Sequence, residues 1–244
     1  MGTRVHVMGL EVDVLTEETL QAQLTEYLTN DYLNIVHLVS MDYVEEESSD
    51  DVRQALAEAD LVLPGENAIL NGHHVGVLEA GGMVVNYRNV FSVLESIRLD
   101  GKKSYFVMRN RNEAKRFYGL IRRMHMGDTC VGIYALDGKA TDEMVINDLN
   151  TQVPDLVFLA LDKETQEQWI HENRQKMNAK LCICVGGVLP LIQRENPHIP
   201  NVLKILHLDG VYRKLLRIPN SYSIRTRIFK KKMADYNNKK QNEE

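Results

Sequence analysis

Residues 154–187 read "PDLVFLALDKETQEQWIHENRQKMNAKLCICVGG", and this stretch decides the fold. Two runs within it, "DLVFLAL" (155–161) and "KLCICVGG" (180–187), have strand length and are apolar at nearly every position. Such a composition is typical of strands covered on both faces in a parallel sheet. The segment between them, 164–177, has helical periodicity. A strand, a helix and a second strand in this order predict a right-handed parallel crossover.

The same alternation continues toward the amino terminus. Further apolar runs of strand length occur at 33–40, 60–64, 104–108 and 129–136. The other segments with helical periodicity are 17–29, 42–58, 89–99, 112–124, 140–150 and 200–217. We therefore predict an α/β protein with a mainly parallel, doubly wound (Rossmann-like) sheet and helices on both faces. Such a sheet binds its ligands at the carboxyl ends of the strands.

The two ends of the chain add smaller elements. The opening "RVHVMGLEVDVL" (4–15) alternates apolar and polar residues around Gly9, which predicts an N-terminal edge hairpin. Past residue 219 the sequence becomes basic, and its larger apolar side chains fall at helical spacing: Tyr222, Phe229, Met233 and Tyr236. We predict one α/β domain at 1–219 and a basic helical C-terminal appendage at 220–244 whose end is disordered.

Composition narrows the possible partners and the location. The 244 residues, 44% of them hydrophobic, can fill a sizeable core, and the net charge of -5 gives no reason to expect nucleic acid as a partner. Positive charge is concentrated at 213–244, which holds ten Lys or Arg against three acidic residues. No run resembles a secretory signal or a membrane span, so we expect a cytoplasmic protein.

Cysteine and histidine spacing gives no metal site. Cys130, Cys182 and Cys184 lie in strand-like runs without a CxxC spacing, which favours buried free thiols. His73 and His74 are adjacent, and no carboxylate pair is spaced to join them. We assign no metal and no cofactor.

Three blocks of the sequence resemble one enzyme family. In the first, the matching residues are Gln166, Glu167, Trp169, Ile170, Asn173, Val185, Gly186 and Gly187. The second block is "HLDGVYRKLLRIP" (207–219), and the third is "VRQALAEADLVLP" (52–64). Over roughly residues 5 to 220, the chain is similar to the WecG/TagA/CpsF family of bacterial surface-polysaccharide glycosyltransferases.

The resemblance implies a reaction and its partners. Family members transfer an N-acetylmannosamine-type sugar from a uridine diphosphate (UDP) donor to a lipid-linked acceptor at the inner face of the cytoplasmic membrane. The transfer is inverting and metal-independent, so it needs a base for the acceptor hydroxyl and stabilisation of the departing diphosphate. We therefore expect a hexosyltransferase with a UDP-sugar donor and a lipid-linked acceptor, in cell-surface polysaccharide or teichoic acid synthesis.

This chain departs from the family at the catalytic positions. The family's Thr and Asn on the strand at 33–40, and the Asp of a following loop, correspond here to His37, Val39 and Gly65. The base would then be His37, or Glu66 by a one-residue shift. The alternatives are a His37 satisfied in the core and a Glu66 that is only an exposed acid at a helix start.

Other loops have changed as well. Arg109 and Asn110 stand in place of a glycine pair, and 162–164 replaces small residues and a proline. Three further family positions, a Gly and two Asp, are occupied by Tyr87, Asn89 and Pro190. Side chains at the former glycines would crowd a phosphate. The alternative to a divergent transferase is therefore a non-catalytic member, a scaffold or regulatory partner of a polysaccharide-synthesis enzyme.

The predicted substrate contacts in the main domain are Gln166, Glu167, Gly186, Gly187, Asp209 and Arg213. Gln166 and Glu167 could hold a sugar or a ribose, or Glu167 could be only a first-turn acid of its helix. The glycine pair could present N–H groups to an anion or form a tight turn. Arg213 could bind the diphosphate or pair with Asp209.

The appendage supplies the last predicted contacts. By resemblance its arginines close over the donor, which indicates Arg225 and Arg227. Its lysines and apolar side chains also predict binding to an anionic membrane surface, with a solvated tail as the alternative. Family members self-associate, so a homo-oligomer is expected too. The predicted location is the cytoplasm, with peripheral attachment to the inner face of the membrane.

Overall fold

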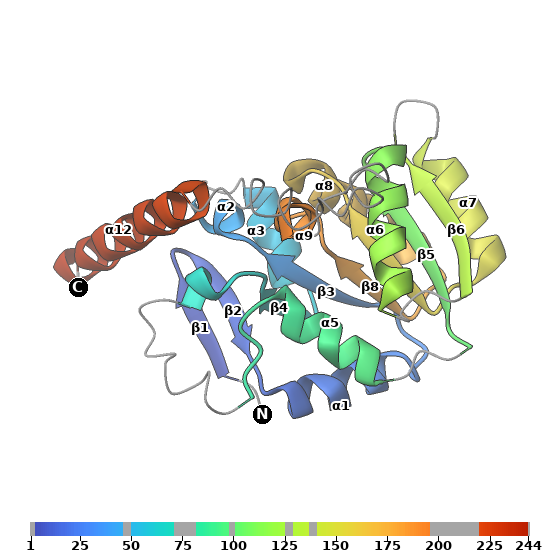
Figure 1. Ribbon diagram of the computed structural model, residues 1–244, viewed down its shortest axis with the longest axis horizontal. Helices are drawn as coiled ribbons and strands as arrows, with labels where there is room; N and C mark the ends of the chain where they lie inside the picture. Colours follow the sequence, from blue (N-terminus) through green and yellow to red (C-terminus); the bar gives the residue numbers. More distant parts are fainter. Residues whose placement is uncertain are drawn as a thin grey trace, which may run out of the picture.

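The computed structural model describes residues 3–45, 50–70, 82–97, 101–124, 129–136, 141–195 and 220–243. Within them, six parallel strands form one sheet in the order β4-β3-β8-β7-β5-β6 (Figure 1). The strands are β3 (Asn34–Val39), β4 (Leu61–Pro64), β5 (Lys103–Met108), β6 (Thr129–Ala135), β7 (Leu156–Ala160) and β8 (Leu181–Cys184). All six predicted strand runs and the mainly parallel sheet are confirmed.

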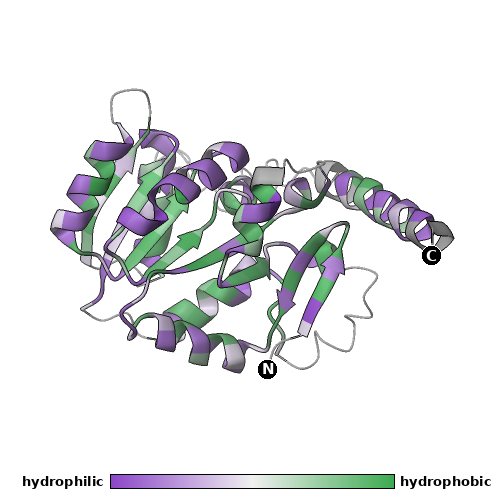
Figure 2. Cartoon of the chain, turned by 180° about the vertical axis from the view of Figure 1, so that it is seen from behind, coloured by the Kyte–Doolittle hydropathy of each residue, from purple (hydrophilic) through white to green (hydrophobic). Residues whose placement is uncertain are grey.

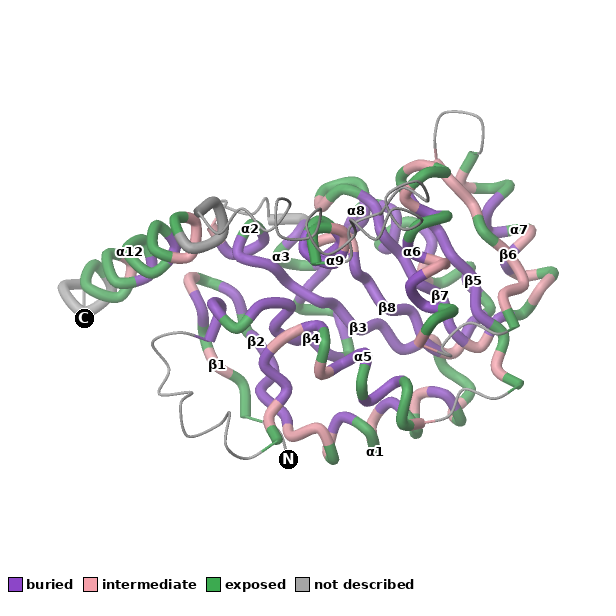
Figure 3. The backbone as a smooth tube through the Cα atoms, in the orientation of Figure 1, coloured by how far each residue is buried: buried purple, intermediate pink, exposed green. Residues whose placement is uncertain are grey.

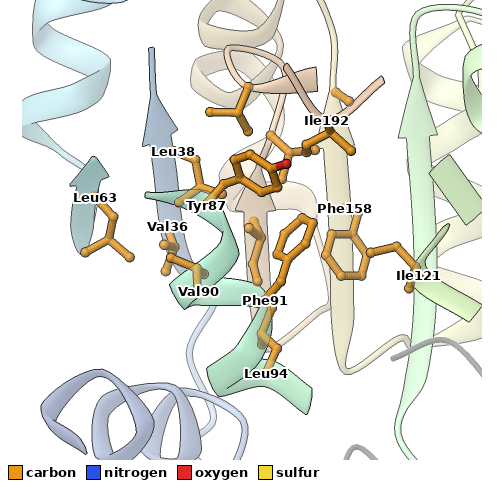
Figure 4. Packing of buried hydrophobic residues seen from close by; sticks show 14 of the residues in the cluster. Val36, Leu38, Leu63, Tyr87, Val90, Phe91, Leu94, Ile121, Phe158 and Ile192 are labelled. Atoms are coloured by element: carbon orange, nitrogen blue, oxygen red, sulfur yellow. The ribbon is translucent and has the colours of Figure 1, made fainter. Parts of the chain in front are cut away.

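Helices cover both faces of this sheet, as predicted. One face is covered by α1 (Glu17–Tyr27), α5 (Tyr87–Ser96), α6 (Arg111–Arg123) and α9 (Leu189–Glu195). The other is covered by α3 (Asp50–Ala57), α7 (Asp142–Gln152) and α8 (Lys163–Asn173), which the short η2 (Arg174–Lys176) continues. Figure 4 shows the first face, with Tyr87 and Phe91 of α5 and Ile192 of α9 packed near Phe158 of β7.

The central strands are buried because both of their faces are covered. β3, β7 and β8 are buried along their whole length and consist mainly of apolar residues (Figures 2 and 3). Phe106 and Phe158 stack with their ring centroids 5.2 Å apart, an arrangement that adds about 1 kcal/mol to the gain from burial. Cys182 and Cys184 are buried free thiols on one face, as predicted, whereas the free thiol of Cys130 is only partly buried.

The predicted N-terminal hairpin forms a separate two-stranded sheet. Its strands, β1 (Thr3–Val7) and β2 (Leu10–Val14), are antiparallel, and Gly9 in the turn has a φ of +92°, which suits glycine. The buried carboxylate of Asp13 accepts a hydrogen bond of 2.8 Å from the Val62 N–H, and its other oxygen accepts one of 2.8 Å from Arg4. A side chain thus ties the hairpin to β4.

Two predicted helices differ from what the structure describes. The segment 42–58 was expected to be one helix, but it contains α2 (Met41–Glu45) and α3, with residues 46–49 outside the described part. A short η1 (Asn67–Leu70) follows β4. The predicted helix at 200–217 lies outside the described residues.

The appendage forms the helix α12 (Asn220–Glu243), drawn in red in Figure 1. Phe229 and Met233 are buried in the core that the hairpin and α2 share, as their spacing predicted. Arg225 forms an ion pair with Asp42 of α2. None of the helices in the described part is both long and apolar enough to cross a bilayer. The domain boundary at residue 219 and the disorder of the last residues stay predictions.

Candidate active site

Four of the predicted site residues meet at the carboxyl ends of β3, β7 and β8. His37 lies in β3, Gln166 and Glu167 lie in α8 after β7, and Gly186 follows β8. The helices after β7 and β8 pack on opposite faces of the sheet. In doubly wound proteins, ligands bind next to the carboxyl ends of two neighbouring strands whose following helices pack on opposite faces of the sheet.

Gln166 and Glu167 form a buried hydrogen-bond network with Tyr43 of α2. The Tyr43 hydroxyl donates to Glu167 Oε1 over 3.0 Å, and Gln166 Nε2 donates to that hydroxyl over 2.9 Å. Gln166 Oε1 in turn accepts from the Gly186 N–H over 3.2 Å. These bonds fix the Glu167 carboxyl group relative to α2, α8 and the loop after β8.

His37 lies next to this network. Its Nδ1 is 3.4 Å from Glu167 Oε1, and the two side chains are only 1% and 2% exposed. Burial lowers the pKa of His37 to about 3 and raises the pKa of Glu167 to about 7, because the charged form of each group loses its hydration. Below neutral pH the pair therefore consists of a neutral imidazole and a protonated carboxyl group.

The Glu167–His37 pair has hydrogen-bonding capacity left over. Among the described residues, Glu167 Oε2 and His37 Nε2 are buried and have no hydrogen-bond partner. Each such atom costs about 1–3 kcal/mol of folding free energy, so buried polar atoms without a partner are few in native proteins. A catalytic role is one explanation for keeping them. The alternative that Glu167 is only a first-turn acid is wrong, because α8 begins at Lys163 and its first-turn acid is Glu164.

Packing closes position 65, where the resemblance predicts an Asp in the family. A Cβ added to Gly65 would lie 2.1 Å from Val188 Cγ1 and 2.6 Å from the carbonyl oxygen of Val39. Val188 is fully buried. A valine therefore fills the space that a side chain at position 65 would need.

Glu66, the second predicted base, is bound to the backbone. Its Oε1 accepts a hydrogen bond of 2.9 Å from the Met41 N–H at the start of α2. The side chain is 2% exposed, so the alternative of an exposed acid is wrong. The turn at Gly65 directs Glu66 beneath α2 instead of into solvent, where it satisfies a helix-end donor.

The glycine pair after β8 is required by close packing. A Cβ at Gly186 would lie 2.2 Å from the Leu161 carbonyl oxygen, and one at Gly187 would lie 2.6 Å from Cε2 of Tyr43. The Gly186 N–H already donates to Gln166. The tight-turn interpretation thus accounts for both glycines, and the Gly186 N–H is not available to an anion in this state.

Side chains at the positions where the resemblance predicts small residues have structural partners. Arg109 forms ion pairs with Glu113 and, over 2.7 Å, with Asp162. Tyr87 contacts Glu195 through its hydroxyl and thereby links α5 to α9. The changed loops are therefore held together by new polar contacts.

Among the described residues, the appendage contacts α2 and η1 next to the site. Arg225 pairs with Asp42, which precedes the Tyr43 of the network, and Arg227 is exposed. Asp209, Arg213, His73 and His74 lie outside the described residues. The described residues contain no cluster of three side chains that could hold a metal ion.

Sequence reasoning missed Tyr43, Lys163 and Val188. Tyr43 could have been found, because it closely follows a buried strand at the ligand-binding edge. Lys163 Nζ lies 5.8 Å from the centroid of the Tyr43 ring, and its charge lowers the pKa of Glu167 against the effect of burial. The contact of Val188 with position 65 had no signal in the sequence, since it depends on the packing of two loops.

Comparison with known proteins agrees with the resemblance. Residues 5–228 match the model of the Glycosyl transferase WecG/TagA/CpsF family. The chain belongs to this family.

Curated proteins that are similar to this chain include two from Staphylococcus aureus. Each is named N-acetylglucosaminyldiphosphoundecaprenol N-acetyl-beta-D-mannosaminyltransferase, from strain MRSA252 and from strain NCTC 8325 / PS 47. They are 28% and 26% identical to this chain over 75 residues, which is 31% of this chain. The chain spans 30% of the length of these relatives.

Proposed function

We propose that this chain transfers an N-acetylhexosamine of the N-acetylmannosamine type from a UDP-sugar to a lipid-linked acceptor in cell-surface polysaccharide or teichoic acid synthesis. Membership of the family supports the reaction class. One observation carries the proposal: a carboxyl group with a pKa near neutrality, that of Glu167, lies beside His37 at the ligand-binding edge of the sheet. Groups tuned in this way cluster at catalytic sites.

In the proposed reaction the acceptor hydroxyl oxygen attacks the anomeric carbon of the donor sugar. The bond from that carbon to the diphosphate breaks with inversion, and UDP leaves with the electron pair. The hydroxyl proton passes to the Glu167 carboxylate, and His37 stays neutral beside it because burial lowers its pKa to about 3. General-base catalysis of this kind accelerates a reaction by about 10²–10⁴-fold.

The network prepares Glu167 for this role. The bonds from Tyr43 and Gln166 and the charge of Lys163 lower its pKa, whereas burial raises it more. The result, about 7, leaves roughly half of the molecules ready to accept a proton at neutral pH. The substrate would approach from the side of Gly186, the partly exposed end of the network.

We propose that cations around the same edge of the sheet stabilise the negative charge of the departing diphosphate. Lys163 begins α8 beside the Tyr43 ring, and Arg225 reaches α2 at Asp42. Arg227 and Arg213 are the further candidates by resemblance, and Asp209 is the candidate for a sugar hydroxyl. A cation near the leaving group stabilises the charge that develops in the transition state.

The first test is calorimetry with UDP, followed by detection of the transferred sugar on a lipid-linked acceptor. The transferase proposal predicts a dissociation constant below about 1 mM and a product that carries the donor sugar. The experiment uses the full chain with lipid present, because the appendage is part of the proposed site. A dissociation constant for UDP above about 1 mM would contradict the transferase proposal.

A non-catalytic scaffold is the second candidate, and the closed position at Gly65 favours it. Val188 occupies the space of the family's base, and His37 and Glu167 are almost completely buried. A scaffold predicts neither UDP binding nor product in the same experiment. The two candidates therefore give opposite results.

We further propose that α12 attaches the protein to the inner face of the cytoplasmic membrane. Its outer side carries Ile224 and Ile228, 56% and 49% exposed, among exposed cations that include Arg227 and Lys231. Apolar side chains flanked by cations suit the interface of an anionic bilayer. Self-association into a homo-oligomer stays a prediction.

Vesicle co-sedimentation tests the membrane attachment. Replacing both isoleucines, I224E/I228E, should reduce binding to anionic vesicles by at least about tenfold, since apolar burial and charge attraction are both lost. The matched control N237E/N238E adds the same charge to exposed polar positions of α12. Equal losses in the two variants would leave only a general charge effect and contradict insertion of the isoleucines.

A further inference from the structure

The helix α12 packs against α2, the short helix that carries Tyr43 (Figure 1). Phe229 and Met233 of α12 are buried in the same apolar cluster as Met41, Tyr43 and Val44 of α2. Because Phe229 and Met233 are one helical turn apart, both project from the same side of α12. This part of α12 is therefore anchored in the core beside α2.

Two ion pairs join α2 to α12 at either end of α2. Arg225 pairs with Asp42 near the start of α2, and Lys232 Nζ lies 3.1 Å from Glu45 Oε2 at its end. The Glu45 side chain is only 16% exposed, so solvent screens this second pair less than a pair in open water. The two cations are two helical turns apart and lie on the same side of α12 as the two buried apolar residues. Together these four residues define the inner side of α12.

The helix α2 is too short to be stable by itself. It consists of five residues, Met41–Glu45, whereas an isolated helix of about 12–15 residues is already marginal in water. Its start is held by Glu66, whose Oε1 accepts a hydrogen bond from the Met41 N–H. The position of the rest of α2, including Tyr43, therefore depends on the elements that pack against it, and α12 is one of them.

The side chain of Tyr43 links α2 to the candidate active site. Its hydroxyl donates to Glu167 Oε1 over 3.0 Å. Its ring lies against the loop after β8, since a Cβ at Gly187 would come within 2.6 Å of Cε2 of the ring. Hydrogen bonds weaken steeply when the donor moves out of line. A shift of α2 would therefore weaken the bond that the Glu167 carboxyl group accepts.

We propose that the inner side of α12 holds α2 so that the Tyr43 hydroxyl stays on the Glu167 carboxyl group, an inference that rests on the proposed role of Glu167 in transfer. The positioning residues are Phe229, Met233 and Lys232. They act on the reaction through the packing of α2, separately from the donor contacts expected of the arginines of α12.

Four titratable or charged groups interact with Glu167: His37 in β3, Tyr43 in α2, Cys184 in β8 and Lys163 in α8 itself. Tyr43 is the one that lies on the helix held by α12. Its hydrogen bond favours the charged carboxylate and so lowers the pKa of Glu167. Loosening α12 should therefore raise the pKa of Glu167 above its present value of about 7, while the other three groups stay on the sheet and on α8.

Phe229→Ala and Phe229→Leu test the packing step. Alanine leaves the space of the ring empty, whereas leucine keeps most of the apolar volume. Single-turnover transfer is measured against pH with a short-chain, water-soluble acceptor, which keeps membrane attachment out of the assay. In F229A we expect the acid limb of the pH–rate profile to move up by about one pH unit, because a hydrogen bond to the carboxylate is weakened.

The size of the effect should depend on pH. Transfer by F229A should be about fivefold slower at pH 7, because fewer molecules carry the carboxylate, and should recover near pH 9. F229L should stay close to the unsubstituted protein. A loss of equal size at every pH would overturn the proposal, because F229A would then act only through general stability.

Charge variants at the end of α2 test the same step even if F229A fails to fold. K232E brings two carboxylates together at Glu45, and E45K/K232E restores a pair of opposite charges in reversed order. K239E, at an exposed position of α12, changes the charge of the helix by the same amount as K232E. We expect K232E to move the acid limb up by about half a pH unit more than K239E does, and E45K/K232E to return it. Equal shifts in K232E and K239E, or no return in the double variant, would overturn the proposal.

Titration of the Glu167 carboxyl group separates failure of this inference from failure of the proposed function. Carbon NMR of the full chain with isotope-labelled glutamate carboxyl groups follows the pKa of Glu167 without a substrate, and E167Q assigns the signal. A raised pKa of Glu167 in F229A and K232E without any sugar transfer would remove the transferase function and keep the coupling of α12 to Glu167. Transfer by the unsubstituted protein with the same Glu167 pKa in every variant would remove the coupling and keep the function.

Discussion

The end of β4 and the start of α8 lie at the same edge of the sheet and have changed in opposite ways. At the end of β4, Gly65 has no side chain, and Val188 fills the space that a side chain there would need. At the start of α8, Glu167 is buried beside His37 and held by Tyr43. Under the proposed function, α8 supplies at this edge the carboxyl group that the loop after β4 has no room to carry.

The largest expected effect is at the end of β4. Gly65→Asp introduces the residue type that the resemblance predicts for the family but places its Cβ within 2.1 Å of Val188 Cγ1. We expect the free energy of unfolding to fall by at least about 4 kcal/mol, because overpacking and an unpaired buried charge add together. Urea unfolding measures this loss.

The double variant G65D/V188A sharpens the test of that contact. Removing the valine methyl groups relieves part of the clash, whereas the 2.6 Å approach to the Val39 carbonyl oxygen remains. The two substitutions should therefore couple favourably by more than about 1 kcal/mol. Additive effects would show that Val188 does not close position 65.

The next effect concerns the pH dependence of stability at the start of α8. Native Glu167 keeps its proton up to a pH of about 7, because burial raises its pKa, whereas the unfolded chain loses that proton near the ordinary glutamate pKa of 4.5. The native state thus binds one more proton in this window, and the contribution of Glu167 to stability falls as pH rises. His37, whose pKa is lowered to about 3, acts in the opposite direction up to its unfolded value of 6.5.

Glu167→Gln removes one of these two opposing contributions. The free energy of unfolding of E167Q minus that of the unsubstituted protein should rise by about 3 kcal/mol from pH 4.5 to 7. Glu164→Gln, on an exposed side chain of the same helix, should leave that difference flat. Identical pH profiles for E167Q and the unsubstituted protein would contradict the raised pKa of Glu167.

The smallest of these effects is expected at Tyr43. Tyr43→Phe removes a hydroxyl that donates to Glu167 and accepts from Gln166, and we expect a loss of about 1–2 kcal/mol in urea unfolding. The pKa of Glu167 should rise further, because the bond from Tyr43 lowers it. Tyr32→Phe, at a residue 76% exposed, is the control and should change stability by less than about 0.5 kcal/mol. A stable Y43F would indicate that the network does not hold Glu167.

The sequence predicted the sheet well because its signals are local. Continuous apolar runs such as that of β7, separated by amphipathic helices, determine strands and crossovers without knowledge of distant contacts. The same pattern indicated the edge where His37, Gln166 and Glu167 meet. The burial of Glu66 and the closure of Gly65 by Val188 were not predictable, because each depends on side chains from separate loops. The raised pKa of Glu167 likewise follows from its three-dimensional surroundings.

The rate of sugar transfer by E167Q tests most directly whether the Glu167–His37 pair is the base. Single-turnover transfer from UDP-N-acetylmannosamine to a lipid-linked N-acetylglucosaminyl diphosphate would be compared with that of the unsubstituted protein, with UDP affinity measured in parallel. A Glu167 base predicts transfer slower by at least about 100-fold with UDP affinity unchanged. Transfer at the rate of the unsubstituted protein would contradict a role of Glu167 as the base.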